Sequence, residues 1–149
     1  MSPSDLDREV RMQIFRFFVE NGRPPRVEEA TVALAIARAE VGGTYERLAA
    51  NRVIVLEPGT LDVRMANPLS AVPTPFPVTV AGKEFFGNCI WDALGVVSML
   101  GSTGVVHSSC GCCGELMPLR VEDGAVQAAE GLVHFAVPAL HWWDDIVYT

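Results

Sequence analysis

Four prolines in one short stretch divide this chain of 149 residues into two unlike halves. They stand in NPLSAVPTPFP, residues 67–77. Proline has a fixed φ and no N–H to donate, so it is excluded from helix interiors and from central strands. The stretch therefore predicts an extended connector, with one folded part at residues 1–66 and a second at residues 78–149.

The first part has the pattern of three helices followed by a hairpin. Apolar residues recur at helical spacing from Leu6 to Phe18, and NGRPP at residues 21–25 ends that helix. A second helical run, VEEATVALAIARAE, is predicted to end at the Gly-Gly pair of residues 42–43, and Thr44 is predicted to cap a third helix. RVIVLE and LDVRMA, separated by a Pro-Gly turn, have the composition of a hairpin. Together these elements predict a winged-helix-like subdomain.

The second part has the pattern of a small sheet around one buried helix. VTVAGKEFF is typical of a hairpin that turns at Ala81 and Gly82, and CIWDALGVVSML is long and apolar enough for a buried helix. Four further segments have the composition of strands: Gly104 to His107, Leu116 to Val121, Ala125 to Ala128 and Leu132 to Val137. The predicted fold class is therefore α+β, with a small mixed or antiparallel sheet packed on the helix.

Charge and hydropathy argue against several classes of function. The formal net charge is −7 and Lys83 is the single lysine, so the chain lacks the broad positive surface that a phosphate backbone demands. The third helical segment carries only Arg47, with Arg52 just beyond it, which is thin for reading a DNA groove. No run approaches the roughly 18 apolar residues of a membrane span, and the start MSPSDLDREV has no signal-peptide pattern. We therefore expect a cytoplasmic protein that binds neither nucleic acid nor membrane.

The stretch GNCIWDAL, residues 87–94, places a thiol and a carboxylate three positions apart in an apolar run. In a reducing cytoplasm, free thiols are more typical of metal binding or catalysis than of disulfides. With Asn88 as N-cap, Cys89 would lie in the first helical turn, where backbone N–H groups lower the pKa of a thiol and favour the thiolate. Asp92 would lie on the same helix face, as a proton carrier beside a soft-metal ligand. The alternative is a buried cysteine beside a carboxylate that only stabilises its helix.

Three further cysteines, Cys110, Cys112 and Cys113, fall within the short motif CGCCGE. Cys110 and Cys113 have the C-x-x-C spacing of a metal knuckle or of a redox pair. One knuckle supplies two ligands, so structural zinc at Cys110 and Cys113 would need two more. These would have to come from Cys112 or from the three histidines, His107, His134 and His141. Redox exchange, mercury capture and ordinary turn cysteines are the other interpretations.

Three stretches of the chain carry a family resemblance: NPLSAVPTPFPVTVAGKEFFGNCIWDALGV, SSCGCCGELMPL and VHFAVPALHWWDDIVYT. Together they resemble the alkylmercury lyase family, the organomercurial lyases that split carbon–mercury bonds. The resemblance implies that Cys89 is a mercury-binding thiolate and that Asp92 helps to move a proton to the leaving carbon. It implies protonolysis, in which R–Hg⁺ and a proton give R–H and Hg²⁺. Mercury is then substrate and product, no organic cofactor is needed, and small cytosolic thiols are the partners.

The chain departs from that family pattern in one respect. The resemblance implies a second mercury-binding cysteine downstream, but no cysteine follows Cys113 in the sequence. The sequence stops before that cysteine, or the chain is a member that lacks it, or a thiol within residues 110–113 replaces it. The leading function is lyase activity carried by Cys89 and Asp92. The alternative is a noncatalytic mercury-, metal- or thiol-binding protein on the same fold.

Overall fold

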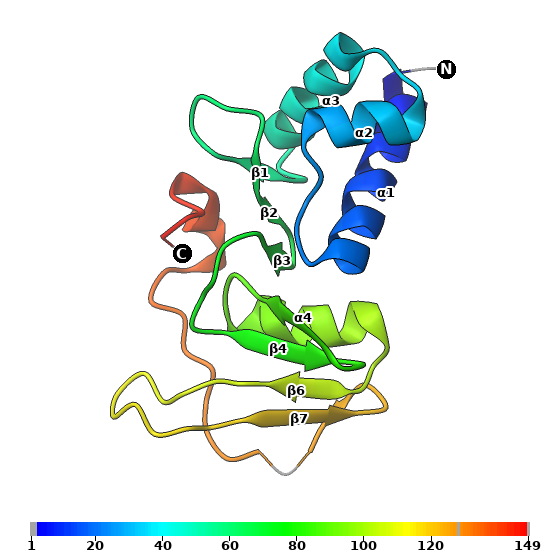
Figure 1. Cartoon of the computed structure of the whole chain (residues 1–149). Coiled ribbons are helices and arrows are strands. Elements are labelled where there is room, and N and C mark those ends of the chain that lie inside the picture. The colour runs from blue at the N-terminus through cyan, green and yellow to red at the C-terminus, as the bar shows by residue number, and fades with distance from the viewer. Residues whose placement is uncertain (1–2, 128, 149) are drawn as a thin grey trace.

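The computed structural model describes residues 3–127 and 129–148, and it begins with three helices. They are α1 (Pro3–Asn21), α2 (Val27–Leu34) and α3 (Arg38–Ala50), which pack on one another at one end of the molecule (Figure 1). Val10, Ile14 and Phe18 are buried along α1 at helical spacing, and they form its inward face. Helix α1 ends at Asn21, the first residue of NGRPP, so the predicted end of the first helix is confirmed.

The boundary between α2 and α3 differs from the predicted one. The second helix stops at Ala35, whose φ of 54° is left-handed, and α3 runs straight through the glycine pair at 42–43. A Cβ on Gly42 would lie 3.3 Å from a methyl group of Leu61, so this glycine permits a close approach rather than ending a helix. Thr44 is not an N-cap, because its hydroxyl donates to a backbone carbonyl oxygen inside the helix at 2.8 Å. Tertiary packing has outweighed the local signal of two glycines.

A three-stranded antiparallel sheet follows the helices. Its strands are β1 (Val55–Leu56), β2 (Val63–Ala66) and β3 (Leu69–Ser70), in the order β1-β2-β3. The first two form the predicted hairpin, whereas the sequence does not predict β3, which lies inside the proline-rich stretch. An edge strand is where such a stretch can be accommodated. Leu69 also forms an isolated bridge with Gly87, so the stretch pairs with chain on both sides of it.

A five-stranded antiparallel sheet and one helix form the other half of the molecule. The strands are β4 (Pro77–Val80), β5 (Lys83–Phe86), β6 (Gly104–Val106), β7 (Leu119–Glu122) and β8 (Ala125–Val126), in the order β5-β4-β6-β7-β8. Helix α4 (Ile90–Leu100) lies against β4 and β6, with Ala93, Val96 and Val97 buried (Figure 1). Their spacing places them on one helix face, which explains why this apolar run packs as a helix on the sheet. The predicted buried helix is confirmed.

The segment after β8 differs from the prediction. Leu132–Val137 forms no strand but an irregular chain that leads into a 3-10 helix, η1 (Ala139–Asp144). Leu132 is 98% exposed, so the apolar pattern of this segment finds no neighbouring strand on which to pack. The Trp143 ring instead lies under the guanidinium of Arg52, 5.5 Å from the ring centroid. Ala128, the end of another predicted strand, lies outside the described residues.

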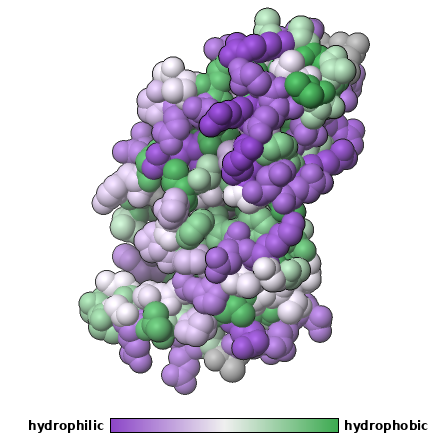
Figure 2. Space-filling model, viewed as in Figure 1, coloured by the Kyte–Doolittle hydropathy of each residue, from purple (hydrophilic) through white to green (hydrophobic). Residues whose placement is uncertain are grey.

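Buried apolar side chains run continuously through both halves, from Val10 on α1 to Val121 on β7. The α+β class, with helices first and antiparallel sheets after them, is confirmed. Hydrophilic side chains cover most of the visible face over the helices (Figure 2). Within the described residues, no helix combines the length and apolarity that a membrane crossing needs. The division at residues 67–77 and the winged-helix-like character of the first part stay predictions.

Candidate active site

The candidate site lies where β5 ends and α4 begins. Gly87 makes this junction possible, because a Cβ there would lie 2.4 Å from the backbone nitrogen of Ala93. The Gly87 N–H donates to the carbonyl oxygen of Phe76 at 3.0 Å, and its carbonyl oxygen accepts from the hydroxyl of Thr74 at 2.5 Å. The proline-rich stretch therefore holds the first turn of α4 against the end of the sheet.

Cys89 is the N-cap of α4. Its backbone is extended, with φ −143° and ψ −178°, and its sulfur accepts a hydrogen bond from the backbone N–H of Asp92 at 3.5 Å. The sulfur thus occupies the place of the side-chain oxygen that commonly caps a helix. The prediction that Asn88 is the N-cap is wrong by one residue, because the Asn88 side chain points to other partners. The cysteine and the aspartate are brought together as predicted, and Cys89 is half-buried.

Asn88 links Asp92 to the proline-rich stretch. Its Nδ2 donates to Asp92 Oδ2 at 3.0 Å and to Asn67 Oδ1 at 3.1 Å, and the carbonyl oxygen of Pro68 lies 3.4 Å from it. Its Oδ1 is buried and has no hydrogen-bond partner among the described residues. Sequence reasoning misses this contact, because Asn67 lies 21 positions upstream of Asn88 and no local pattern joins the two. The only available signal is a polar amide directly before the cysteine.

Burial raises the pKa of both Cys89 and Asp92. For Cys89 burial is the main cause and the Asp92 carboxylate adds to it, while the backbone N–H groups of Asp92 and Trp91 oppose it. The prediction of a thiolate favoured at neutral pH is therefore wrong for the free protein, because burial outweighs the helix N-terminus. Burial also raises the pKa of Asp92, against the hydrogen bonds from Asn88 and from the Cys89 thiol. The free pair thus holds its protons more tightly than isolated side chains do.

The other three cysteines lie on the loop between β6 and β7, residues 107–118, which we call the cysteine hairpin. Cys110 is half-buried, and Cys112 and Cys113 are exposed. The backbone N–H groups of Cys113 and Cys112, and then the Cys113 side chain, lower the pKa of Cys110. Across residues 3–127 and 129–148, no three His, Cys, Asp or Glu side chains are arranged around one metal position. The Cys110–Cys113 knuckle therefore has two ligands where tetrahedral zinc takes four.

The candidate site and the cysteine hairpin leave the five-stranded sheet at the same end. Phe86 pairs with Pro77, whose carbonyl oxygen accepts from the His107 N–H at 2.8 Å, so the ends of β5 and β6 are level. Helix α4 follows the end of β5, and the cysteine hairpin follows the end of β6 (Figure 1). The His107 ring hydrogen-bonds Thr79 at 2.9 Å, and the His141 ring hydrogen-bonds Asp144 at 2.9 Å.

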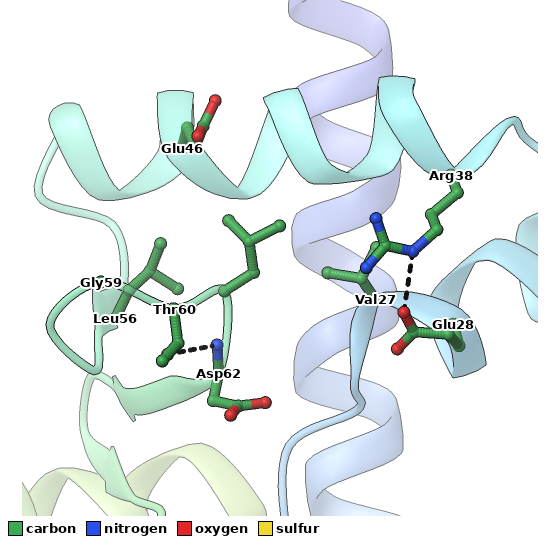
Figure 3. A pocket seen from close by; sticks show the side chains of 9 residues that line it. Val27, Glu28, Arg38, Glu46, Leu56, Gly59, Thr60 and Asp62 are labelled. Atoms are coloured by element: carbon green, nitrogen blue, oxygen red, sulfur yellow. Dashed lines mark hydrogen bonds and ion pairs between the residues drawn. The ribbon is translucent and has the colours of Figure 1, made fainter.

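A hollow of about 620 Å³ lies away from these thiols, between α2, α3 and the turn that joins β1 to β2 (Figure 3). Its charged lining residues are Glu28, Arg38, Glu46 and Asp62. Arg38 is paired with Glu28 at 2.8 Å. The hollow has no cysteine in its lining and takes no part in the candidate site.

Residues 69–149 match the protein-family model described as alkylmercury lyase, or MerB, and this range is more than half of the chain. The chain belongs to the alkylmercury lyase family. The match begins in β3 and contains Cys89, Asp92 and the cysteine hairpin. The resemblance carried by the three stretches of sequence is thereby confirmed.

A solved structure of the same family shows how far the shared fold extends. The chain is similar to a crystal structure described as the mercury-bound form of MerB2, with a TM-score of 0.63 and 21% sequence identity. The similarity covers 85% of this chain and 67% of that chain, so it reaches beyond the family match into the helices. At this identity it establishes a common fold. A comparison with curated proteins gave no match.

Proposed function

We propose that this member of the alkylmercury lyase family cleaves carbon–mercury bonds by protonolysis, with Cys89 as the mercury-binding thiolate and Asp92 as the proton carrier. The observation that carries the proposal is that a thiol and a carboxyl group share the first turn of α4, where the Cys89 sulfur accepts from the Asp92 backbone N–H, within the matched segment. Protonolysis needs a soft ligand for mercury and an acid within reach of the carbon. This turn offers both.

The proton that reaches the carbon starts on the Cys89 sulfur. When R–Hg⁺ approaches, the sulfur forms a bond to mercury and the thiol proton passes to the Asp92 carboxylate. Asp92 then gives this proton to the carbon as the carbon–mercury bond breaks and its electron pair goes to carbon. The balance is R–Hg⁺ plus Cys89–SH giving R–H plus Cys89–S–Hg⁺.

The surroundings of Asp92 suit this exchange. Burial raises the pKa of its carboxyl group toward the pH at which a group both accepts and returns a proton efficiently. The hydrogen bond from Asn88 fixes one carboxylate oxygen and leaves the other to exchange the proton. Trp91, between the two reacting residues in the sequence, is 64% exposed and offers an apolar surface to an alkyl or aryl group.

We propose that small cytoplasmic thiols complete the cycle. Mercury on Cys89 is bound by one protein thiolate at this site, so a second, soluble thiolate can take it by ligand exchange. Cytoplasm is the compartment in which such thiols are abundant and the protein's own cysteines stay reduced. Omission of the small thiol is then expected to stop the reaction after the first equivalent of mercury.

The test is turnover of phenylmercuric acetate by the reduced protein with excess small thiol, with benzene measured by gas chromatography. Multiple turnovers are expected for the wild type and for Cys112→Ser, which changes an exposed cysteine outside the proposed pair. Cys89→Ser and Asp92→Ala are expected to release no benzene above background. Undiminished turnover by Cys89→Ser would refute the assignment of the thiolate.

A noncatalytic binder is the second candidate, and one observation favours it. Among the described residues, the first turn of α4 carries one cysteine and the other three lie on the cysteine hairpin, whereas the family resemblance implies two mercury-binding cysteines at the site. A binder would hold one equivalent of organomercurial at Cys89 and release no benzene in the same assay. Benzene in excess of the protein excludes this candidate.

A further inference from the structure

The cysteine hairpin carries a second arrangement of thiols, apart from Cys89. The Gly114 N–H donates to the carbonyl oxygen of Cys110 at 2.9 Å, which closes a single helical turn at the tip of the hairpin. Side chains three positions apart lie on the same side of such a turn, and those two apart do not. Cys110 and Cys113 therefore face each other, and Cys112 points away. The Cys113 side chain accordingly contributes to lowering the pKa of the Cys110 thiol.

The strands on either side hold this turn in place. The Cys110 N–H donates to the carbonyl oxygen of Glu115 at 2.8 Å, and Ser109 bridges Leu116. One step further down, Ser108 and Met117 exchange hydrogen bonds through both backbone and hydroxyl groups. The chain reverses at Gly114, whose φ of +76° is left-handed. The two sulfurs are thus presented together before any ligand arrives, which lowers the entropic cost of binding.

We propose that Cys110 and Cys113 form a two-thiolate site for a soft cation that takes two ligands, of which Hg²⁺ is the representative. Thiolates select soft cations, and this pair has no third His, Cys, Asp or Glu ligand among the described residues. A cation that needs four ligands, such as zinc, is left incomplete here, whereas two-coordinate Hg²⁺ is satisfied. Binding releases two protons: two R–SH and Hg²⁺ give (RS)₂Hg and two H⁺.

The position of the site is compatible with access from solution. The hairpin projects from the body of the molecule (Figure 1), and Cys112 and Cys113 are exposed. It leaves the sheet at the same end as the first turn of α4. Among the described residues, neither Cys89 nor Asp92 joins Cys110 and Cys113 in a group of three metal-binding side chains, and the site does not depend on the proposed lyase reaction.

Phenylarsine oxide tests the pairing, because it forms a stable ring only with two neighbouring thiols. Its oxygen leaves as water while arsenic bonds to both sulfurs. Intact-mass spectrometry of the reduced full chain is expected to show one adduct per protein that survives an excess of 2-mercaptoethanol. Cys110→Ser and Cys113→Ser are each expected to lose it, whereas Cys112→Ser, the matched control in the same loop, and Cys89→Ser keep it.

A second measurement uses the metal alone. The Cys89→Ser variant is expected to retain one equivalent of Hg²⁺ in the presence of 2-mercaptoethanol and to show the ultraviolet absorption of a mercury–thiolate bond. The double variant Cys89→Ser, Cys110→Ser is expected to lose the bound Hg²⁺ and this absorption. A phenylarsine oxide adduct that is lost in Cys112→Ser but kept in Cys113→Ser would overturn the assignment. An adduct or bound Hg²⁺ that is unchanged by Cys110→Ser would also overturn it. Neither measurement involves benzene release, so failure here and failure of the lyase proposal are distinguishable.

Discussion

Replacing Gly87 with alanine is expected to damage the candidate site although Gly87 contributes no side chain to it. The new Cβ would lie 2.4 Å from the nitrogen, 2.6 Å from the Cα and 2.8 Å from the Cβ of Ala93. Ordinary contacts between carbon atoms are about 3.5–4.0 Å, so the two segments must separate by about 1 Å. Rotation of a side chain cannot relieve a clash with backbone. Overpacking costs roughly 1–3 kcal/mol, and Gly87→Ala belongs at the upper end of that range.

Thermal unfolding measures this cost. A loss of about 3 kcal/mol lowers the melting temperature of a chain of this size by roughly 6–12 °C. Gly111→Ala is the matched control, because no atom beyond its two chain neighbours lies within 4 Å of its added Cβ. Benzene release by Gly87→Ala, at a temperature where the variant is folded, should also fall because the first turn of α4 must move. Equal melting temperatures for the two alanine variants would refute the reasoning.

Three further predictions concern ionisable groups. Asn88→Ala removes a hydrogen bond that lowers the pKa of Asp92. The acidic limb of the pH–activity profile of this variant should therefore move to higher pH. An unchanged acidic limb would contradict the effect of Asn88 on Asp92. Iodoacetamide at neutral pH should label Cys110 before Cys89, because the pKa of the Cys110 thiol is lowered and that of the Cys89 thiol is raised by burial. Peptide mass spectrometry gives the order of labelling, and the reverse order would refute the argument. The pKa of Glu29 is lowered to about 2, chiefly by the hydrogen bond from Arg23, so its contribution to stability is present above about pH 4.5 and is lost as the pH falls toward 2. Glu29→Gln should therefore reduce the pH dependence of the free energy of unfolding, measured with urea. An unchanged pH dependence would contradict this prediction.

Helix α4 could be predicted from the sequence because its burial pattern is local and continuous. Its apolar side chains recur on one face, and that face packs on β4 and β6. Leu132–Val137 has an equally apolar composition but forms no strand, because a strand also needs a neighbour with free backbone groups. The prediction of the boundary between α2 and α3 was wrong for a related reason. Gly42 serves a close contact with Leu61, which no local pattern reveals.

The proximity of Cys89 and Asp92 could be predicted from the sequence, but the protonation of the two groups could not. The three-residue spacing of Cys89 and Asp92 implies a shared helix turn, and the structure has one. The sign of the thiol's pKa depends on how deeply the turn is buried, and burial is a property of the whole fold. The link from Asn88 to Asn67 is likewise tertiary, because it joins residues on opposite sides of β4 and β5 in the chain.

The pairing of Leu69 with Gly87 limits where genetic recombination can join halves of different relatives. Leu69 is fully buried and belongs to β3, yet it bridges the junction from which α4 starts. A crossover at residue 78 would bring in a new α4 but leave behind the Leu69 and Asn67 that support its first turn. A crossover before Asn67 would carry those supports along with the cysteine they position. The structural unit that supports Cys89 and Asp92 therefore begins within the proline-rich stretch, where the family match also begins.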